Sequence, residues 1–503
     1  MKKCLLLVGL SMAACSPESV EPEPTQAVAP SVSKERRDEL KTVFGKAFAT
    51  ALADSPSLRK LIKTEAMAKF DNDYDVLYHL IKDRPLADGQ TVRDLLLGYF
   101  ENAEQLAAVE REVPLLTIFV PELPNDAFSA VSWDVDTQIP VVGITSYKTN
   151  DVTVVDRNGE AHVIEAALIP AFPVVVIKEN ERVIPVAGSN PSAMSKTRVL
   201  KASNSLGFAF LSDNFDRSLN KDVSASRVIK VPDTKLVDAY NTYLTADGWH
   251  RDYIYYNISP SQPRGAFSYD YQEHVRSFRM VGDPVIAFSK IADQTGEPAL
   301  ASLVQQPTSG WTGGAFEFKV RVLINAKNGL GQELVTYFSA LPDELFTLAY
   351  DERKVSVFTF YKPRISELRT KSLSLPLFAW DLNDYASTIK IEVEEVDLTE
   401  TIVQSETRTV KFATNFGIDP TVGFLQKIGL KFGASLEETR TETTQRTYTV
   451  GNDILGSVIV NFADNVLTDS FTTVIFGTPR VYWNAREYET GWFSLSVEPT
   501  RVQ

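Results

Sequence analysis

The chain has 503 residues, of which 44% are hydrophobic and 10% aromatic, so it can bury large cores but is too long for a single one. Lys2 and Lys3 belong to an amino-terminal stretch that is expected to be cleaved off. Without them, 49 basic residues oppose 65 acidic ones, which gives a net charge of −16. Such a balance repels the phosphate backbone and argues against nucleic-acid partners.

The first fifteen residues have the layout of an export signal. Lys2 and Lys3 precede the apolar run 5–10, and small residues lead up to Cys15. The apolar run is shorter than the roughly 20 residues that a spanning helix needs. Of the two cysteines, Cys4 leaves with the leader, so the exported chain has no disulfide, cysteine-ligated zinc or cysteine nucleophile.

The leader ends in Ala-Ala-Cys and resembles the lipobox of bacterial lipoproteins, although Met12 stands where Leu is usual. The resemblance implies cleavage after residue 14, lipid on Cys15, and a membrane partner reached through that lipid. The alternative is an ordinary secretory signal in which Cys15 is incidental. Residues 15–32 are rich in Pro and Glu and are expected to form a tether to the outer membrane or cell surface.

Residues 33–112 are predicted to form an α-helical domain, because apolar residues recur there every three and four positions. Ser55-Pro56 and Thr91 with Asp94 are typical helix starts. The acidic stretch Asp71-Asn72-Asp73-Tyr74-Asp75 suggests a calcium loop, but Val76 and Lys82 stand where an EF-hand needs Gly and Glu. We therefore expect a solvated loop between helices.

Residues 113–200 are predicted to form an antiparallel β domain of short strands. Asp156-Arg157-Asn158-Gly159 predicts a hairpin turn, and residues 178–181 predict a second one. Region 201–314 is predicted to contain both helix and strand: Asp233 is expected to cap a helix, and residues 253–256 are predicted to form a strand. Its aromatic residues favour a core under loops, with a binding surface for a sugar or protein as the alternative; the candidates for that surface are Trp249, Tyr255, Tyr269 and Trp311.

Residues 315–503 are predicted to form an all-β, sandwich-like domain, so that the fold class is α+β and multidomain. Alternation over 316–322 indicates a strand with one buried and one wet face, and residues 355–361 indicate a central strand. A β-bulge is expected at Glu394-Glu395. We expect no cofactor, with Ca²⁺ as an alternative whose ligands are the acids Asp381, Asp384 and Asp397.

Two Thr-rich runs, 399–409 and 437–449, flank a more apolar, glycine-containing segment. This arrangement resembles the pore-forming module of aerolysin-like toxins, which implies a segment that enters a membrane on oligomerisation. The alternative is a pair of twisted surface strands whose Thr residues and charges prevent edge aggregation.

The motifs of common enzyme classes are absent from the sequence. His79, His162, His250 and His274 lie far apart, and no metal-ligand spacing, nucleophile elbow or phosphate loop occurs. The sequence therefore favours a non-enzymatic lipoprotein that binds a protein or glycan partner. The alternatives are the pore-forming protein and a hydrolase whose triad comes from separate loops and includes His250 or His274.

Overall fold

The computed structural model describes residues 32–502 except 188–197, 203–205, 220–232, 247, 257, 259–260, 262–264, 293–308, 327–330, 397–399, 414–436, 451–452 and 476–477. Cys15 and the tether therefore lie outside the described residues. The described chain has mixed α/β content, with many antiparallel sheets and few helices. No helix of this part is long and apolar enough to cross a membrane.

The amino-terminal body begins with short helices that pack on a sheet. Ser33 accepts an N-terminal amide of the first helix. Ser55 accepts an N-terminal amide of the second helix, and Thr91 and Asp94 form a capping box, both as expected. The helices are α1 (Lys34–Asp54), α2 (Pro56–Ala68), α3 (Tyr78–Ile81), α4 (Val92–Leu97) and α5 (Ala103–Glu112).

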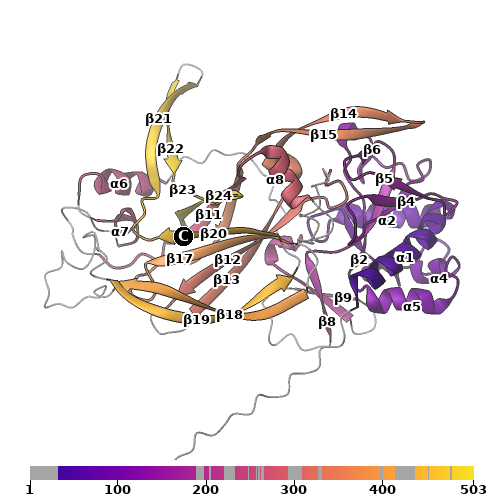
Figure 1. Cartoon of the computed structure of the whole chain (residues 1–503), viewed down its shortest axis with the longest axis horizontal. Helices are drawn as coiled ribbons and strands as arrows, with labels where there is room; N and C mark the ends of the chain where they lie inside the picture. The colour runs from indigo at the N-terminus through magenta and orange to yellow at the C-terminus, as the bar shows by residue number, and fades with distance from the viewer. Residues whose placement is uncertain are drawn as a thin grey trace, which may run out of the picture.

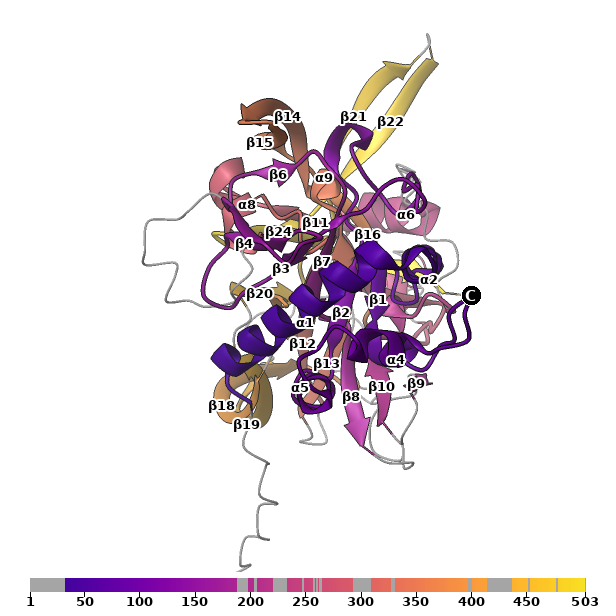
Figure 2. The same ribbon diagram turned by 90° about the vertical axis from the view of Figure 1, so that its right-hand side faces the viewer.

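The sheet of this body has six strands. In spatial order they are β1 (Asp75–Leu77), β2 (Leu116–Phe119), β7 (Val174–Glu179), β3 (Val141–Ile144), β4 (Val152–Val155) and β5 (Ala161–Ile164). All neighbours are antiparallel except β3 and β7, which are parallel. Helix α1 lies across the sheet, and helices and strands share one hydrophobic core (Figure 2). The predicted boundary at residue 113 therefore falls inside one core.

One predicted hairpin is confirmed and the other is wrong. β4 and β5 pair around Asp156–Gly159, and Gly159 adopts the positive φ of 79° that the turn requires. β7 and β8 (Val183–Ala187) do not pair with each other. β8 joins a small separate sheet with β10 (Leu206–Phe210) and β9 (Val199–Lys201), because residues 180–182 turn into a buried polar network.

The carboxyl-terminal body contains two four-stranded antiparallel sheets that share one core. One sheet has the order β16 (Lys371–Pro376), β11 (Tyr271–Met280), β24 (Phe493–Arg501) and β23 (Glu487–Glu489). The other has the order β13 (Gly331–Ala340), β12 (Phe316–Asn325), β17 (Thr388–Glu395) and β20 (Asp453–Asn461). The expected bulge is present as a register shift between Val393 and Glu394.

Strand β12 differs from the expectation of one wet face. All ten of its residues are buried, including Glu317, Lys319 and Arg321, which alternate with the apolar residues of the core. Charges are tolerated on this face because carboxylates of neighbouring strands lie close to the bases. Arg321 lies 3.0 Å from Glu333, and Lys319 lies 3.8 Å from Glu394.

The region before β12 contributes α6 (Thr234–Tyr243), α7 (His250–Tyr255) and α8 (Pro284–Ile291). Asp233 caps α6 as predicted. The predicted strand at 253–256 is wrong, because these residues belong to the end of α7 and the residue after it. The Asp252 carboxylate accepts the Trp249 amide at 2.9 Å, and burial of the aromatic face overrides their strand propensity.

Three ribbons extend from the two sheets (Figure 1). After the short helix α9 (Pro342–Leu345), β14 (Phe346–Val355) pairs with β15 (Phe358–Leu368), and β15 pairs with β6 (Ile169–Pro170) of the amino-terminal body. The expected central strand at 355–361 is therefore wrong: the chain turns at 356–357 and is exposed there. The other ribbons are β18 (Glu400–Ala413) with β19 (Glu437–Val450), described by backbone alone, and β21 (Leu467–Ile475) with β22 (Thr478–Ala485).

Candidate functional site

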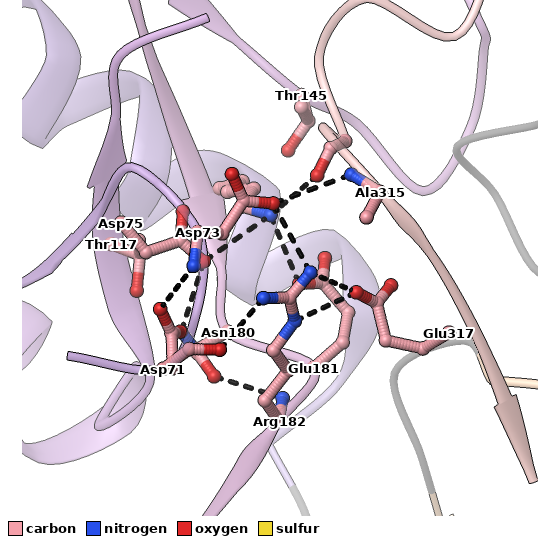
Figure 3. A network of polar contacts seen from close by, with 12 residues as sticks. Asp71, Asp73, Asp75, Thr117, Thr145, Asn180, Glu181, Arg182, Ala315 and Glu317 are labelled. Atoms are coloured by element: carbon pink, nitrogen blue, oxygen red, sulfur yellow. Dashed lines mark hydrogen bonds and ion pairs between the residues drawn. The ribbon is translucent and has the colours of Figure 1, made fainter. Parts of the chain in front are cut away.

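A network of buried charges lies where the two bodies meet (Figure 3). Its acids come from the loop between α2 and β1, from the first residue of β1, from the turn after β7 and from the start of β12, and its bases come from the end of β7 and the turn after it. The members are Asp71, Asp73, Asp75, Lys178, Asn180, Glu181, Arg182 and Glu317. The expected solvated loop at residues 71–75 is thus wrong.

Arg182 is the centre of the network. Its guanidinium donates to Asp73 Oδ2 at 3.1 Å, to the main-chain oxygen of Asp71 at 2.8 Å, and through Nε to Glu317 Oε1 at 2.7 Å. The first two partners belong to the amino-terminal body and Glu317 belongs to β12. One fully buried side chain therefore joins the two bodies by charge-assisted hydrogen bonds.

Asn180 and Lys178 hold the other acids. The Asn180 amide donates to Asp71 Oδ2 at 2.8 Å and to Asp75 Oδ2 at 3.2 Å. Its carbonyl accepts the amides of Arg182 and Val183, which shapes the turn. Lys178 lies 3.6 Å from Asp75 and 3.1 Å from Glu181, and donates to the Gly313 carbonyl at 3.1 Å.

The linker before β12 is fitted closely to this network. The Ala315 amide donates to Asp73 Oδ2 at 3.3 Å. Gly314 has a φ of 84°, and a Cβ at that position would come within 2.4 Å of Asp73 Oδ2. A glycine is required there because both the backbone conformation and the space exclude a side chain. Residues 310–314, at the end of the predicted mixed region, form part of the junction, and Trp311 is buried.

The charges of the network do not balance if every group is ionised. Five carboxyl groups oppose two bases, which gives a formal charge of 2 − 5 = −3 in a largely buried space. Burial raises the pKa of Asp75 well above its usual range, and among the described residues Asp75 Oδ1 has no hydrogen-bond partner. Burial also raises the pKa of Glu317 to about 7, against the opposing effect of Arg182. Protons therefore supply part of the missing positive charge.

The other predicted candidates lie elsewhere. Trp249 and Tyr255 are buried in the carboxyl-terminal core, and Trp311 is buried in the amino-terminal core. Tyr269 is exposed. The structure does not bring the four aromatic residues together on one surface, because Trp249 and Tyr255 lie inside one core, Trp311 lies inside the other, and Tyr269 alone is exposed.

Of the predicted calcium ligands, Asp381 has hydrogen-bond partners within the protein. Asp381 Oδ1 accepts the Tyr256 hydroxyl and the Asn383 amide, both at 2.9 Å. Asp384 is exposed, and Asp397 lies outside the described residues. Within the described part, the one group with metal-ligand spacing is Asp156, Glu160 and His162 at the β4–β5 turn. Asp156 Oδ1 already accepts the Asn158 and Glu160 amides there, so its geometry serves the turn.

The buried histidines have structural partners. His250 Nε2 lies 2.9 Å from the Leu236 carbonyl, while its Nδ1 accepts the Val466 amide at 3.0 Å. Burial lowers the pKa of His250 to about 4. Both ring nitrogens therefore contact the main chain, which leaves neither for a serine hydroxyl. His274 Nδ1 lies 3.1 Å from the Gln272 carbonyl, and His79 Nε2 lies 3.0 Å from the Glu110 carbonyl.

Sequence reasoning found the acids at 71–75 but not their partners. Lys178, Asn180 and Arg182 stand in a stretch that has the appearance of an ordinary polar turn, and Glu317 stands in an apparently amphipathic strand. The one available signal was the density of acids in 71–75. Comparison of the chain with family models, curated proteins and solved structures found no match.

We expect Arg182→Met to lower the free energy of unfolding by about 3–5 kcal/mol, because removal of the guanidinium leaves Asp73 and Glu317 buried without their base. Urea denaturation followed by circular dichroism measures the change. Arg84→Met is the matched control, since Arg84 is exposed and pairs with Glu65 at 2.8 Å, and should cost about 0–1 kcal/mol. Equal losses in the two variants would contradict the role of the network.

The raised pKa of Asp75 sets a pH dependence. Between the unfolded pKa and the higher folded pKa, the folded chain binds the proton more tightly, so this group's contribution to stability falls as pH rises. Asp75→Asn has no proton to lose. The Tm of the variant minus the Tm of the parent, measured by calorimetry, should therefore increase from pH 5 to pH 8. Asp384→Asn, at an exposed position, is the control; a pH-independent difference for Asp75→Asn would refute the argument.

Proposed function

We propose that the protein is an exported lipoprotein, held on the outer membrane or cell surface by lipid on Cys15, with a binding rather than an enzymatic role. The lipobox-like leader and the Pro- and Glu-rich tether support the anchor. We also propose that the two four-stranded sheets of the carboxyl-terminal body, which share one core, form a β-sandwich.

The observation that carries the binding role is the β21–β22 ribbon, which stands clear of the body (Figures 1 and 2). Phe471 is 50% exposed and stacks on Tyr482, with ring centroids 5.6 Å apart and an interplanar angle of 21°. Val474 and Val481 of the same ribbon are also exposed. An isolated two-stranded ribbon is marginal in water, and exposed aromatic surface of this kind suits a protein or glycan partner.

The anchor is tested by metabolic labelling with a radioactive fatty acid. Cys15→Ala should lose the label, and a high-salt wash should remove it from the membrane fraction, because the acyl acceptor is gone and the remaining charge-assisted contacts are screened. Cys4→Ala is the matched control and should keep both the label and the membrane location. A Cys15→Ala chain that still labels and still sediments with membranes would exclude this anchor.

A pore-forming protein is the second candidate, and the surface beneath β18–β19 favours it. β18 contacts β17, and β19 contacts β13, on the sheet that contains β12. β12 has a charged face, with Lys319 and Arg321 paired to acids of β13 and β17. Separation of the ribbon from a polar surface would expose less apolar area than separation from a hydrophobic core. Most of the flanked apolar segment, residues 414–436, lies outside the described residues.

The ladder of this ribbon gives the test. Fourteen residue pairs run from Glu400↔Val450 to Ala413↔Glu437, with Thr407 opposite Thr443 near the middle. A pore former should release dye from liposomes, and Thr407→Pro should reduce release at least tenfold because proline cannot donate in a ladder. Far-ultraviolet circular dichroism controls for loss of the remaining fold. A parent chain that stays monomeric and leaves liposomes intact would eliminate this candidate.

A further inference from the structure

The tip of the β14–β15 ribbon has an unusual composition for a tight turn in water. Val355 pairs with Phe358, and only Ser356 and Val357 connect the strands. Two-residue turns favour Gly, Asn and Asp, yet Ser356 adopts a φ of 55° and Val357 follows it. Val357 is 87% exposed, the highest value among the exposed large hydrophobic residues of the described chain, and Phe358 is 54% exposed.

The tip is held in place by the amino-terminal body. Phe172 packs against Phe358 at 5.5 Å and against Phe360 at 5.7 Å between ring centroids. The Ala171 amide donates to the Thr359 carbonyl at 3.0 Å, next to the β6–β15 pairing. Apolar side chains are thus presented on a convex, supported ribbon, with little conformational entropy left to lose on contact.

Basic residues surround these apolar side chains. Arg353 and Lys354 precede the turn, and Lys362 and Arg364 follow it, all four exposed. Two acids lie among them: Glu352 is 3.8 Å from Lys354, and Asp351 is 3.7 Å from Arg364. Four basic and two acidic residues give the segment 351–364 a net charge of 4 − 2 = +2. The whole chain has a net charge of −14. The ribbon tip is therefore a locally basic part of an acidic protein.

We propose that the β14–β15 tip is a membrane-contact site, at which Val355, Val357 and Phe358 enter the interface of a bilayer that contains anionic lipid. A convex apolar tip with a basic collar matches the chemistry of such a surface: the apolar groups leave water, and the bases meet phosphate headgroups. The inference adds a second membrane contact to the lipid anchor of the proposed function. It rests on different residues from that anchor.

Vesicle flotation with the Cys15→Ala chain tests the tip without the lipid. We expect this chain to float with phosphatidylcholine vesicles that contain phosphatidylglycerol, and to bind at least tenfold less to pure phosphatidylcholine. Val357→Asp should reduce binding to the mixed vesicles at least tenfold, because a charge replaces the inserted side chain. Arg353→Ala with Lys362→Ala should reduce binding and weaken its dependence on salt.

Val163→Asp is the matched control, since Val163 is 66% exposed on β5, and should leave vesicle binding unchanged. Unaltered Tm values for the Val→Asp variants exclude unfolding as the cause. Equal binding of the parent and Val357→Asp, or no binding of the parent, would overturn the proposal. So would a change in oligomeric state at Val357→Asp without vesicle binding, which would assign the tip to a second copy of the chain. Fatty-acid labelling reports on Cys15 separately, so either proposal can fail alone.

Discussion

The buried guanidinium of Arg182 is the interaction on which the arrangement of the two bodies depends. It bonds the loop before β1 and the start of β12 at once, over a separation of more than a hundred residues in the chain. A buried charge without partners costs several kcal/mol, so this contact is strongly specific. The neighbouring residues are closely packed around this contact: Gly314 lies against Asp73, Asn180 donates to Asp71, and Lys178 donates to the Gly313 carbonyl. The junction therefore tolerates only small displacements.

Charge also replaces apolar packing elsewhere in the described chain. Arg251 and Glu273 form a fully buried pair at 2.8 Å, with the Tyr255 hydroxyl also donating to Glu273, and so connect α7 to β11. On the sheet that contains β12, the buried bases Lys319 and Arg321 likewise pair with Glu394 of the neighbouring strand β17. Apolar cores fill each body, while ionic contacts fix how α7, β12 and the junction are placed.

Local signals in the sequence were sufficient for several elements. Ser55-Pro56, Thr91 with Asp94, and the Asn-Gly turn at 158–159 each act within a few residues, so their outcome needs no tertiary information. The alternation in β12 identified the strand but not its environment, because burial of Lys319 depends on Glu394, which comes from a distant strand. The helix at His250–Tyr255 was missed for a similar reason: its aromatic residues favour strands until the core encloses them.

The same limit applies to the site. A run of acids at 71–75 is visible in the sequence, but whether it faces water, a metal or a guanidinium is decided by residues about 110 and 245 positions later. Val357 shows the opposite error, because the sequence predicts it to be buried and it is exposed. Its alternation with Val355 and Thr359 resembles a central strand, and only the turn at Ser356 reveals that it faces solvent.

The short pairing of β6 with β15 determines how a force on the β14–β15 ribbon would be transmitted. Only two residue pairs, Phe360↔Pro170 and Tyr361↔Ile169, connect these strands, yet they link the ribbon directly to the amino-terminal body, in which the described chain begins with α1. A force between the ribbon tip and α1 would therefore act on these two residue pairs and on the contacts of Phe172 with Phe358 and Phe360.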